Sequence, residues 1–124
     1  MDFDPLSNKV IGCAIEVHRE LGPGLLESTY EQCLAAELNR SGVPFQVQVD
    51  LPVIYKGTRL DCGYRIDLLV DQQLIVELKS VEQVLKIHEA QIITYMRLTK
   101  VHIGLLINFN VPLLKKGIKR FLLS

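Results

Sequence analysis

The spacing of the apolar residues changes along the chain, and this change constrains the fold more than any other feature. Apolar residues recur every three or four positions over residues 7–21 and 25–40, which is typical of amphipathic helices. Over residues 45–79 they alternate with polar residues or form short blocks, as β-strands do. The helical spacing returns over residues 82–97, and residues 101–107 are almost wholly apolar, as in a strand buried on both faces. The order of these segments predicts an α/β fold.

Turn and cap residues set the expected boundaries. Asp4-Pro5 is a helix-start signal, whereas Gly22-Pro23-Gly24 and Ser41-Gly42 end helices. After the two helices we expect a strand interrupted at Pro52, two further strands, a helix, a strand and a terminal helix, over residues 45–55, 64–70, 74–79, 82–97, 101–107 and 112–121. The third strand, its helix and the fourth strand form a βαβ unit with parallel strands and a right-handed crossover. The economical architecture is a central mixed β-sheet flanked by helices on both faces.

Length and composition limit the class of protein. With 124 residues, the chain has the size of one domain, and we expect residues 1–124 to form it. The apolar fraction of 48% excludes a disordered chain. The longest strongly apolar stretch, Ile103 to Ile107, is far shorter than the roughly 20 residues of a membrane helix. The start Met1-Asp2-Phe3-Asp4-Pro5 is unlike a secretory signal. Three widely spaced cysteines indicate no disulfide framework or zinc ribbon, so we expect a reduced, cytoplasmic protein.

Charge is balanced overall but unevenly spread. All 14 acidic residues lie within residues 1–89, whereas residues 90–124 carry only basic ones. Two interpretations stay open: solvated helix faces, or a basic end that attracts a polyanion beside an acidic site that needs a cation. The overall charge of zero argues against strong, indiscriminate binding of nucleic acid. On the second interpretation, the candidate nucleic-acid contacts are Lys115, Lys116, Lys119 and Arg120.

Two carboxylates are expected to face each other across the hairpin of residues 64–79. If residues 71–73 form its turn, Val70 pairs with Leu74, and Asp67 then lies directly opposite Glu77. Their Cβ atoms would be about 5 Å apart. Two carboxylates that close repel each other unless a cation lies between them. This spacing suits a shared divalent metal.

Lys79 lies on the same face of its strand as Glu77. The same register places Arg65 opposite Lys79, a like-charge pair that the hairpin alone does not explain. The alternative is an exposed sheet face with polar residues at alternate positions. Apolar residues on the opposite faces of both strands argue against it, because they place the strands near the middle of the sheet.

Further polar side chains fall on inward-facing positions of the helices. His88, Gln91 and Tyr95 share one face of the helix over residues 82–97, and together with the carboxylates they indicate a polar pocket. Glu27 shares the apolar stripe of its helix with Tyr30. Glu27 either turns toward a cleft or is a helix N-terminal charge favoured by the helix dipole.

Three short motifs resemble those of known nucleases. Asp67, nine residues and then Glu77-Leu78-Lys79 resemble the bipartite signature of the PD-(D/E)xK nucleases, with Ile66 in place of the usual proline. Gln91-Ile92-Ile93-Thr94-Tyr95 is similar to the Gln-x-x-x-Tyr motif of the exonuclease branch of that superfamily. Gly24-Leu25-Leu26-Glu27-Ser28-Thr29-Tyr30 matches the motif that names the GxxExxY family of small proteins, which is placed in the same superfamily.

The resemblance implies a restriction-endonuclease-like core and metal-dependent hydrolysis of phosphodiester bonds in nucleic acid, with DNA the expected substrate. Asp67, Glu77 and Glu27 suit Mg²⁺ or Mn²⁺, and the backbone carbonyl of Leu78 would complete the shell, as the resemblance implies. Lys79 would orient the attacking water. The residues expected to position substrate or support the site are Gln91, Tyr95, His88 and Tyr30, and less directly His18.

Two other classes of function stay open at this stage. A nuclease fold that has lost catalysis can act as a binding module for nucleic acid or protein. A non-nuclease protein could use the same carboxylates for a metal. The small size and the apolar sheet edges make a homodimer an additional expectation.

Overall fold

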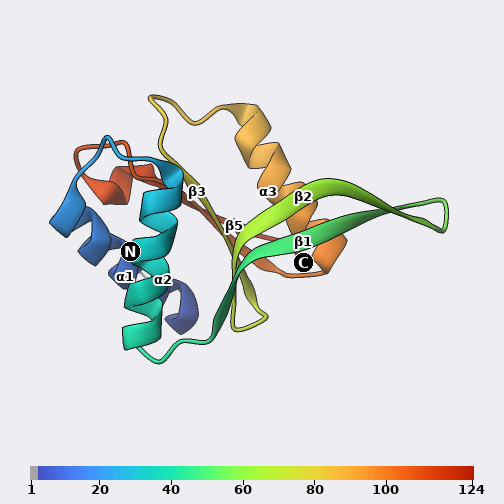
Figure 1. The fold of residues 1–124 in the computed structure, drawn as a ribbon, viewed down its shortest axis with the longest axis horizontal. Coiled ribbons are helices and arrows are strands. Elements are labelled where there is room, and N and C mark those ends of the chain that lie inside the picture. The colour runs from blue at the N-terminus through green and yellow to red at the C-terminus, as the bar shows by residue number, and fades with distance from the viewer. Residues whose placement is uncertain (1–2) are drawn as a thin grey trace.

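The computed structural model describes residues 3–124; Met1 and Asp2, part of the acidic start, lie outside the described residues. Two helices come first and a five-stranded sheet with one further α-helix follows (Figure 1). The elements are α1 (Pro5–Leu21), α2 (Glu27–Arg40), β1 (Phe45–Tyr55), β2 (Thr58–Val70), β3 (Leu74–Lys79), α3 (Lys86–Thr99), β4 (Ile103–Asn108), a 3₁₀ helix η1 (Leu114–Gly117) and β5 (Ile118–Leu122).

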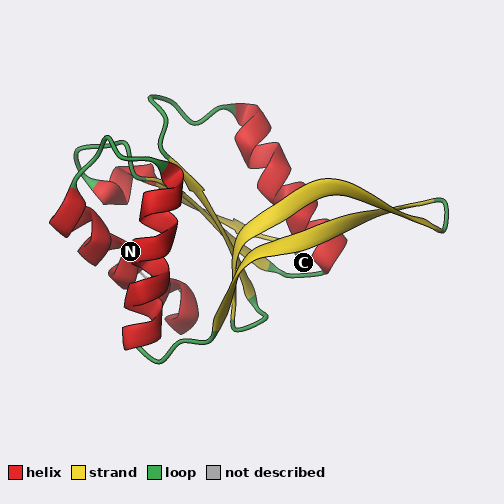
Figure 2. Ribbon diagram, in the orientation of Figure 1, coloured by secondary structure: helices red, strands yellow, loops and turns green. Residues whose placement is uncertain are grey.

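The sheet is mixed, and its strand order follows the sequence, β1-β2-β3-β4-β5. Strands β3 and β4 are parallel, as predicted, and the other neighbours are antiparallel. Helices α1 and α2 cover one face and α3 covers the other (Figure 2). Each face buries its own apolar cluster, because side chains alternate between faces along each strand. The predicted α/β fold with helices on both faces is confirmed.

A side-chain cap explains where the first helix begins. The Asp4 side chain caps α1: its two oxygens accept hydrogen bonds from the backbone N–H of Ser7 at 2.9 Å and from the Ser7 hydroxyl at 2.7 Å. Helix α3 begins at Lys86 rather than at residue 82. None of the helices described combines the length and apolar character needed to cross a bilayer.

The prediction of a helix over residues 112–121 is wrong. This segment forms the short η1 and then β5, which pairs antiparallel with β4, Ile107 opposite Ile118. Its apolar residues fit both periods, since Ile118 packs on the α1 face and Phe121 on the α3 face. Pairing decides between the two: without β5, the apolar strand β4 would leave an unpaired edge.

The first strand has the expected bounds, whereas the second is longer than expected. Strand β2 begins at Thr58 rather than at residue 64, and β1 continues through Pro52, with a register shift between Leu51 and Val53. Together they form a hairpin that projects well beyond the rest of the sheet (Figure 1). We refer to residues 52–64 as the arm.

A close approach between α3 and β4 generates a stability prediction. A Cβ atom at Gly104 would lie 2.7 Å from the Sδ of Met96, which is fully buried. Gly104→Ala should therefore lower the free energy of unfolding by about 1–3 kcal/mol, as measured by urea denaturation. Gly12→Ala is the matched control: a Cβ on this exposed face of α1 meets nothing within 4 Å, so about 0.5–1 kcal/mol of stabilisation is expected. Equal stability of Gly104→Ala and wild type would contradict the close approach.

Candidate active site

Strands β2 and β3 pair over only three positions. The pairs are Leu68 with Val76, Leu69 with Ile75 and Val70 with Leu74, which confirms the register predicted from the turn. Beyond Leu68, β2 stays paired with β1 but leaves β3. The next residues along this register are Asp67 and Glu77.

Two hydrogen bonds between side chain and backbone replace the ladder at that point. The backbone N–H of Asp67 donates to Oε2 of Glu77 at 2.8 Å, and the backbone N–H of Leu78 donates to Oδ2 of Asp67 at 2.8 Å. Each strand thus supplies a carboxylate that accepts from the backbone of the other. The two carboxylates are held beside each other where the strands separate.

Burial dominates the electrostatics of this pair. Glu77 is only 7% exposed, and its pKa is raised to about 9, first because burial penalises the charged form and then because the negative charge of Asp67 lies nearby. The positive charge of Lys79 opposes this shift. With no cation at the site, Glu77 holds a proton at neutral pH.

Lys79 ends β3 on the face that Glu77 shares, since the intervening Leu78 packs into the cluster under α1 and α2. Its side chain is half-buried, and its backbone carbonyl accepts a hydrogen bond from the N–H of Phe109 at 2.9 Å. The expected Arg65–Lys79 pair is wrong. Because β2 has left β3, the Nε of Arg65 lies 3.3 Å from an oxygen of Asp50 on β1 instead.

The donor groups fit a hard divalent cation. The N–H of Leu78 points toward β2, and the carbonyl of a strand residue points to the same side, so the Leu78 carbonyl is directed to the side of β3 on which Asp67 lies. Two carboxylates and this carbonyl give three oxygen donors of the type Mg²⁺ and Mn²⁺ prefer. Within residues 3–124, no group of three His, Cys, Asp or Glu side chains is close enough to form a complete metal site.

A third carboxylate that the sequence did not indicate, Glu31 on α2, connects to the pair. The side-chain amide of Gln48 donates to Oε1 of Glu31 and, at 3.3 Å, to Oδ1 of Asp67. Burial raises the pKa of Glu31, the hydrogen bond from Gln48 opposes the rise, and the charge of Asp67 adds to it. Helical spacing could have indicated Glu31 as a site residue, because it lies one turn after Glu27 on the same face of the helix.

Gln48, whose side chain donates to both carboxylates, has an irregular backbone. Its φ of 49° lies in the left-handed region, which costs a non-glycine residue about 1–2 kcal/mol. Such strain persists only where surrounding contacts impose it, and it is concentrated at functional sites.

The predicted motif at residues 24–30 shapes the entry to α2. Gly24 has a φ of 98°, which a residue with a side chain rarely adopts. Tyr30 is fully buried, and its hydroxyl donates to the Gly22 carbonyl at 2.6 Å and accepts from the Leu25 N–H at 3.1 Å. Its ring stacks on Phe109 at 4.3 Å between centroids. Tyr30 therefore holds the loop before α2.

Glu27 is exposed at the first position of α2 and lines a shallow pocket with Ser80, the residue after Lys79. Within the described residues, no hydrogen bond or ion pair joins it to Asp67 or Glu77. The structure therefore brings Asp67 and Glu77 together but does not bring Glu27 into contact with them.

Helix α3 places Tyr95 near the carboxylates, and Gln91 contacts Tyr95. Burial raises the pKa of Tyr95, and the negative charge of Glu77 raises it further; the side-chain amide of Gln91 donates to the Tyr95 hydroxyl at 3.0 Å. His88 has a different contact, because its Nδ1 accepts from the backbone N–H of Leu85 at 3.0 Å, at the start of the helix. The Nε2 of His18 lies 2.8 Å from the carbonyl of Val111, far along the chain.

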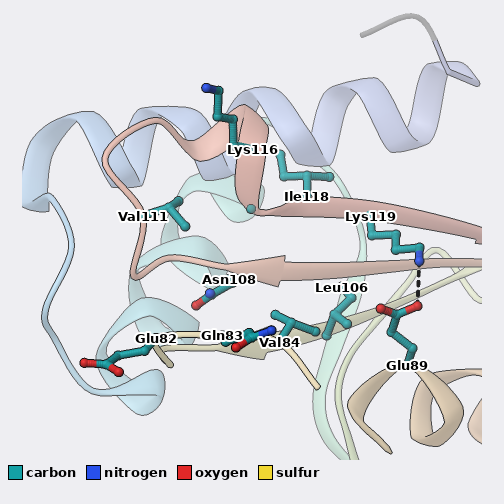
Figure 3. A pocket seen from close by; sticks show the side chains of 11 residues that line it. Glu82, Gln83, Val84, Glu89, Leu106, Asn108, Val111, Lys116, Ile118 and Lys119 are labelled. Carbon is teal, nitrogen blue, oxygen red and sulfur yellow. Dashed lines mark hydrogen bonds and ion pairs between the residues drawn. The ribbon is translucent and has the colours of Figure 1, made fainter. Parts of the chain in front are cut away.

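The basic residues near the C-terminus are spread over different surfaces. A guanidinium nitrogen of Arg120 lies 2.7 Å from Asp4, both side chains being largely buried, so this cation is engaged within the fold. Lys119 pairs with Glu89 at 2.6 Å on the other face, beside a pocket of about 390 Å³ that Lys116 also lines (Figure 3). Lys115 is exposed on η1.

This constellation lies within a recognised family. The model of the PD-(D/E)XK nuclease superfamily matches residues 4–121. The chain belongs to this superfamily. The match extends from the residue that caps α1 to β5, so it covers all the elements that position the site. Comparisons with curated proteins and with solved structures give no match. Nucleases of this superfamily typically use divalent metals, and membership indicates nuclease activity and nucleic acid as the partner.

The raised pKa of Glu77 predicts a pH-dependent stability for the metal-free protein. Between the usual value of 4.5 and about 9, folded Glu77 keeps its proton and unfolded Glu77 releases it. The unfolded state then binds fewer protons, so the free energy of unfolding falls as pH rises through this window. Glu77→Gln should flatten the fall by at least about 1 kcal/mol, as measured by urea denaturation in EDTA at several pH values.

Glu20→Gln is the control, because it removes an exposed carboxylate at the end of α1. Parallel pH profiles for wild type and Glu77→Gln would contradict the assignment of this proton to Glu77.

Proposed function

We propose that the chain is a metal-dependent nuclease that hydrolyses phosphodiester bonds of nucleic acid, with DNA the expected substrate. The observation that carries the proposal is the Asp67–Glu77 pair, in which Glu77 is buried and both carboxylates are held by hydrogen bonds across two separating strands, with Lys79 on the face of Glu77. From the sequence we also propose that the chain is a member of the GxxExxY family and that residues 1–124 form one domain. A homodimer and a cytoplasmic location are further sequence-based predictions.

Asp67, Glu77 and the Leu78 carbonyl would hold Mg²⁺ or Mn²⁺. When bound, the ion supplies Lewis-acid activation of the phosphate and a lower pKa for the attacking water. Glu77 must release its proton for this role, and a neighbouring divalent charge favours the release. The hydrogen bonds from the Asp67 and Leu78 N–H groups then fix both carboxylates, which keeps their oxygens oriented.

Lys79 orients the water and stabilises negative charge that develops on the phosphate oxygens. The residue is half-buried, and its charge lies near enough to Glu77 to affect that carboxyl's pKa, so Lys79 shares the site without being a metal ligand. Tyr95 and Gln91 wall the site and contact the substrate. His88 and Tyr30 support it indirectly, through the start of α3 and the loop before α2.

The third carboxylate comes from α2. Glu31 is the first candidate, because the side-chain amide of Gln48 donates hydrogen bonds both to Glu31 and to Asp67. Glu27 stays in the proposal because it shares a helix face with Glu31 and lies beside Ser80. Two carboxylates one turn apart extend the acidic site toward solvent.

Metal linkage is the first test of this proposal. Millimolar Mg²⁺ or Mn²⁺ should raise the melting temperature, because an ion that binds only the folded state stabilises it by about 2.7 kcal/mol at 100 times its Kd. Asp67→Asn should remove most of this rise. Lys79→Ala should keep the rise but slow the cleavage of labelled nucleic acid about 100-fold, since its interaction forms mainly in the transition state.

Lys100→Ala is the matched control for Lys79→Ala, because Lys100 is an exposed lysine at the end of α3. An identical metal response in wild type and Asp67→Asn would show that the metal binds elsewhere. Protein that binds nucleic acid but yields no product with either ion, on single or double strands of DNA or RNA, would be a binding module instead.

Two exposed lysines are the best candidates for binding phosphates away from the carboxylates. Lys115 and Lys116 lie on η1, whereas Arg120 is already paired with Asp4. Lys115→Ala/Lys116→Ala should weaken nucleic-acid binding and reduce the salt slope, log Kd against log salt, by about 0.7–0.9 for each phosphate that the variant no longer neutralises. Cleavage at saturating substrate should change little. Lys9→Ala on α1 is the control, and an unchanged salt slope in the double variant would exclude a role of these lysines in phosphate binding.

A further inference from the structure

The arm and α3 enclose a groove of about 610 Å³ beside the carboxylate pair. The arm contributes Val53 and Tyr64, and α3 contributes Ile87, Gln91, Thr94 and Tyr95 among others. Tyr64 is 46% exposed, and Ile87 is also exposed. The groove thus presents apolar and aromatic surface to solvent. The proposed roles of the metal and of Lys79 do not account for this surface.

Tyr95 links the groove to the proposed active site. It forms one wall of the groove and packs in the same apolar cluster as Ile75, which precedes Glu77 by two residues on the same face of β3. Gln91, the partner of the Tyr95 hydroxyl, lines the same groove. A molecule that places a phosphate at the carboxylates therefore extends a neighbouring part toward Tyr64.

The chemistry of the lining selects an uncharged, planar ligand. The residues that line the groove include no lysine, arginine, aspartate or glutamate, so a phosphate gains nothing there. The rings of Tyr64 and Tyr95 lie 6.2 Å apart at 59° and form a corner rather than a slot. A flat ring can stack on the open face of Tyr64, while the side chains of Gln91 and Thr94 offer donors and acceptors to its edge.

The pocket on the other side of Glu77 has the opposite character. Leu106 lies beside Glu77 in the sheet and lines that pocket together with Lys116, Lys119 and two glutamates (Figure 3). Charged groups thus gather on one side of the carboxylates, and aromatic and apolar groups on the other. An uncharged base therefore fits the groove, whereas the pocket with charged groups, in which Lys119 is already paired with Glu89, offers it no comparable surface.

We propose that the groove between the arm and α3 binds unpaired bases of single-stranded nucleic acid next to the phosphate at the carboxylates. This inference rests on the proposed nuclease function and specifies its substrate class. Bases of an intact duplex are stacked and paired, so their faces cannot reach Tyr64 unless they leave the helix. The arm holds one wall of the groove, and stacking supplies affinity with little dependence on sequence.

The test compares binding of fluorescein-labelled probes by anisotropy in EDTA, where cleavage does not interfere. The probes are a mixed-sequence single strand, made as DNA and as RNA, the corresponding duplex, and an abasic strand that keeps the phosphates. Wild type should bind the single strand about tenfold or more tightly than the abasic strand or the duplex. Tyr64→Ala should remove this preference, and Tyr64→Phe should retain it because the ring remains.

Tyr55→Ala is the matched control, because Tyr55 lies on the same hairpin, is 59% exposed and is not part of the groove. If wild type and Tyr64→Ala bind the single strand equally and the protein cleaves nucleic acid, the groove does not bind bases. That result would leave the nuclease proposal intact. Absence of both binding and cleavage would overturn both proposals. A dimer that Tyr64→Ala disrupts would assign the groove to a second copy instead.

Discussion

Two hydrogen bonds fix the point at which β2 and β3 separate: the Asp67 N–H donates to the Glu77 carboxylate, and the Leu78 N–H donates to the Asp67 carboxylate. A strand that leaves its neighbour exposes backbone groups that need new partners, and unsatisfied buried groups are costly. Here the carboxylates of the two strands provide these partners. Beyond this point β2 remains paired only with β1, and the two strands continue as the arm. The same pair of bonds therefore ends one ladder, positions two acids and frees the hairpin.

The other end of the site is fixed by the chain after β3. Asn108 is buried at the end of β4, and its side chain accepts from the Val81 N–H at 3.1 Å and donates to the Val81 carbonyl at 2.9 Å. The Phe109 N–H bonds the Lys79 carbonyl, and the Phe109 ring supports Tyr30. Lys79 thus lies between two anchored points. The position of Lys79 therefore depends on its own strand and also on long-range contacts from the end of β4, where Phe109 in turn packs on Tyr30 of α2.

The hairpin register and the shared face of Glu77 and Lys79 were predictable, because a three-residue turn and an alternating pattern leave few choices. The partners of Asp67 were not. The Gln48 side chain bonds Asp67 from a backbone in the left-handed conformation, which the spacing of residues in the sequence does not predict. The link from Asp67 to Glu31 runs through this side chain. The terminal segment was misread for a related reason. Its apolar residues fit helix and strand equally, and the choice was made by the need of β4 for a neighbour.

The arm needs an explanation of its own, because an exposed two-stranded hairpin is marginally stable in water. Strand β1 is an edge of the sheet, and Pro52 with its register shift interrupts the row of backbone groups that another strand would pair with. The arm is thereby protected from pairing with other chains while it keeps apolar side chains on the side of α3. Tyr64 meets Tyr95 there, at the base of the arm, where buried sheet gives way to solvent. The division of the sheet at Asp67 thus produces both the acidic site and the apolar wall beside it.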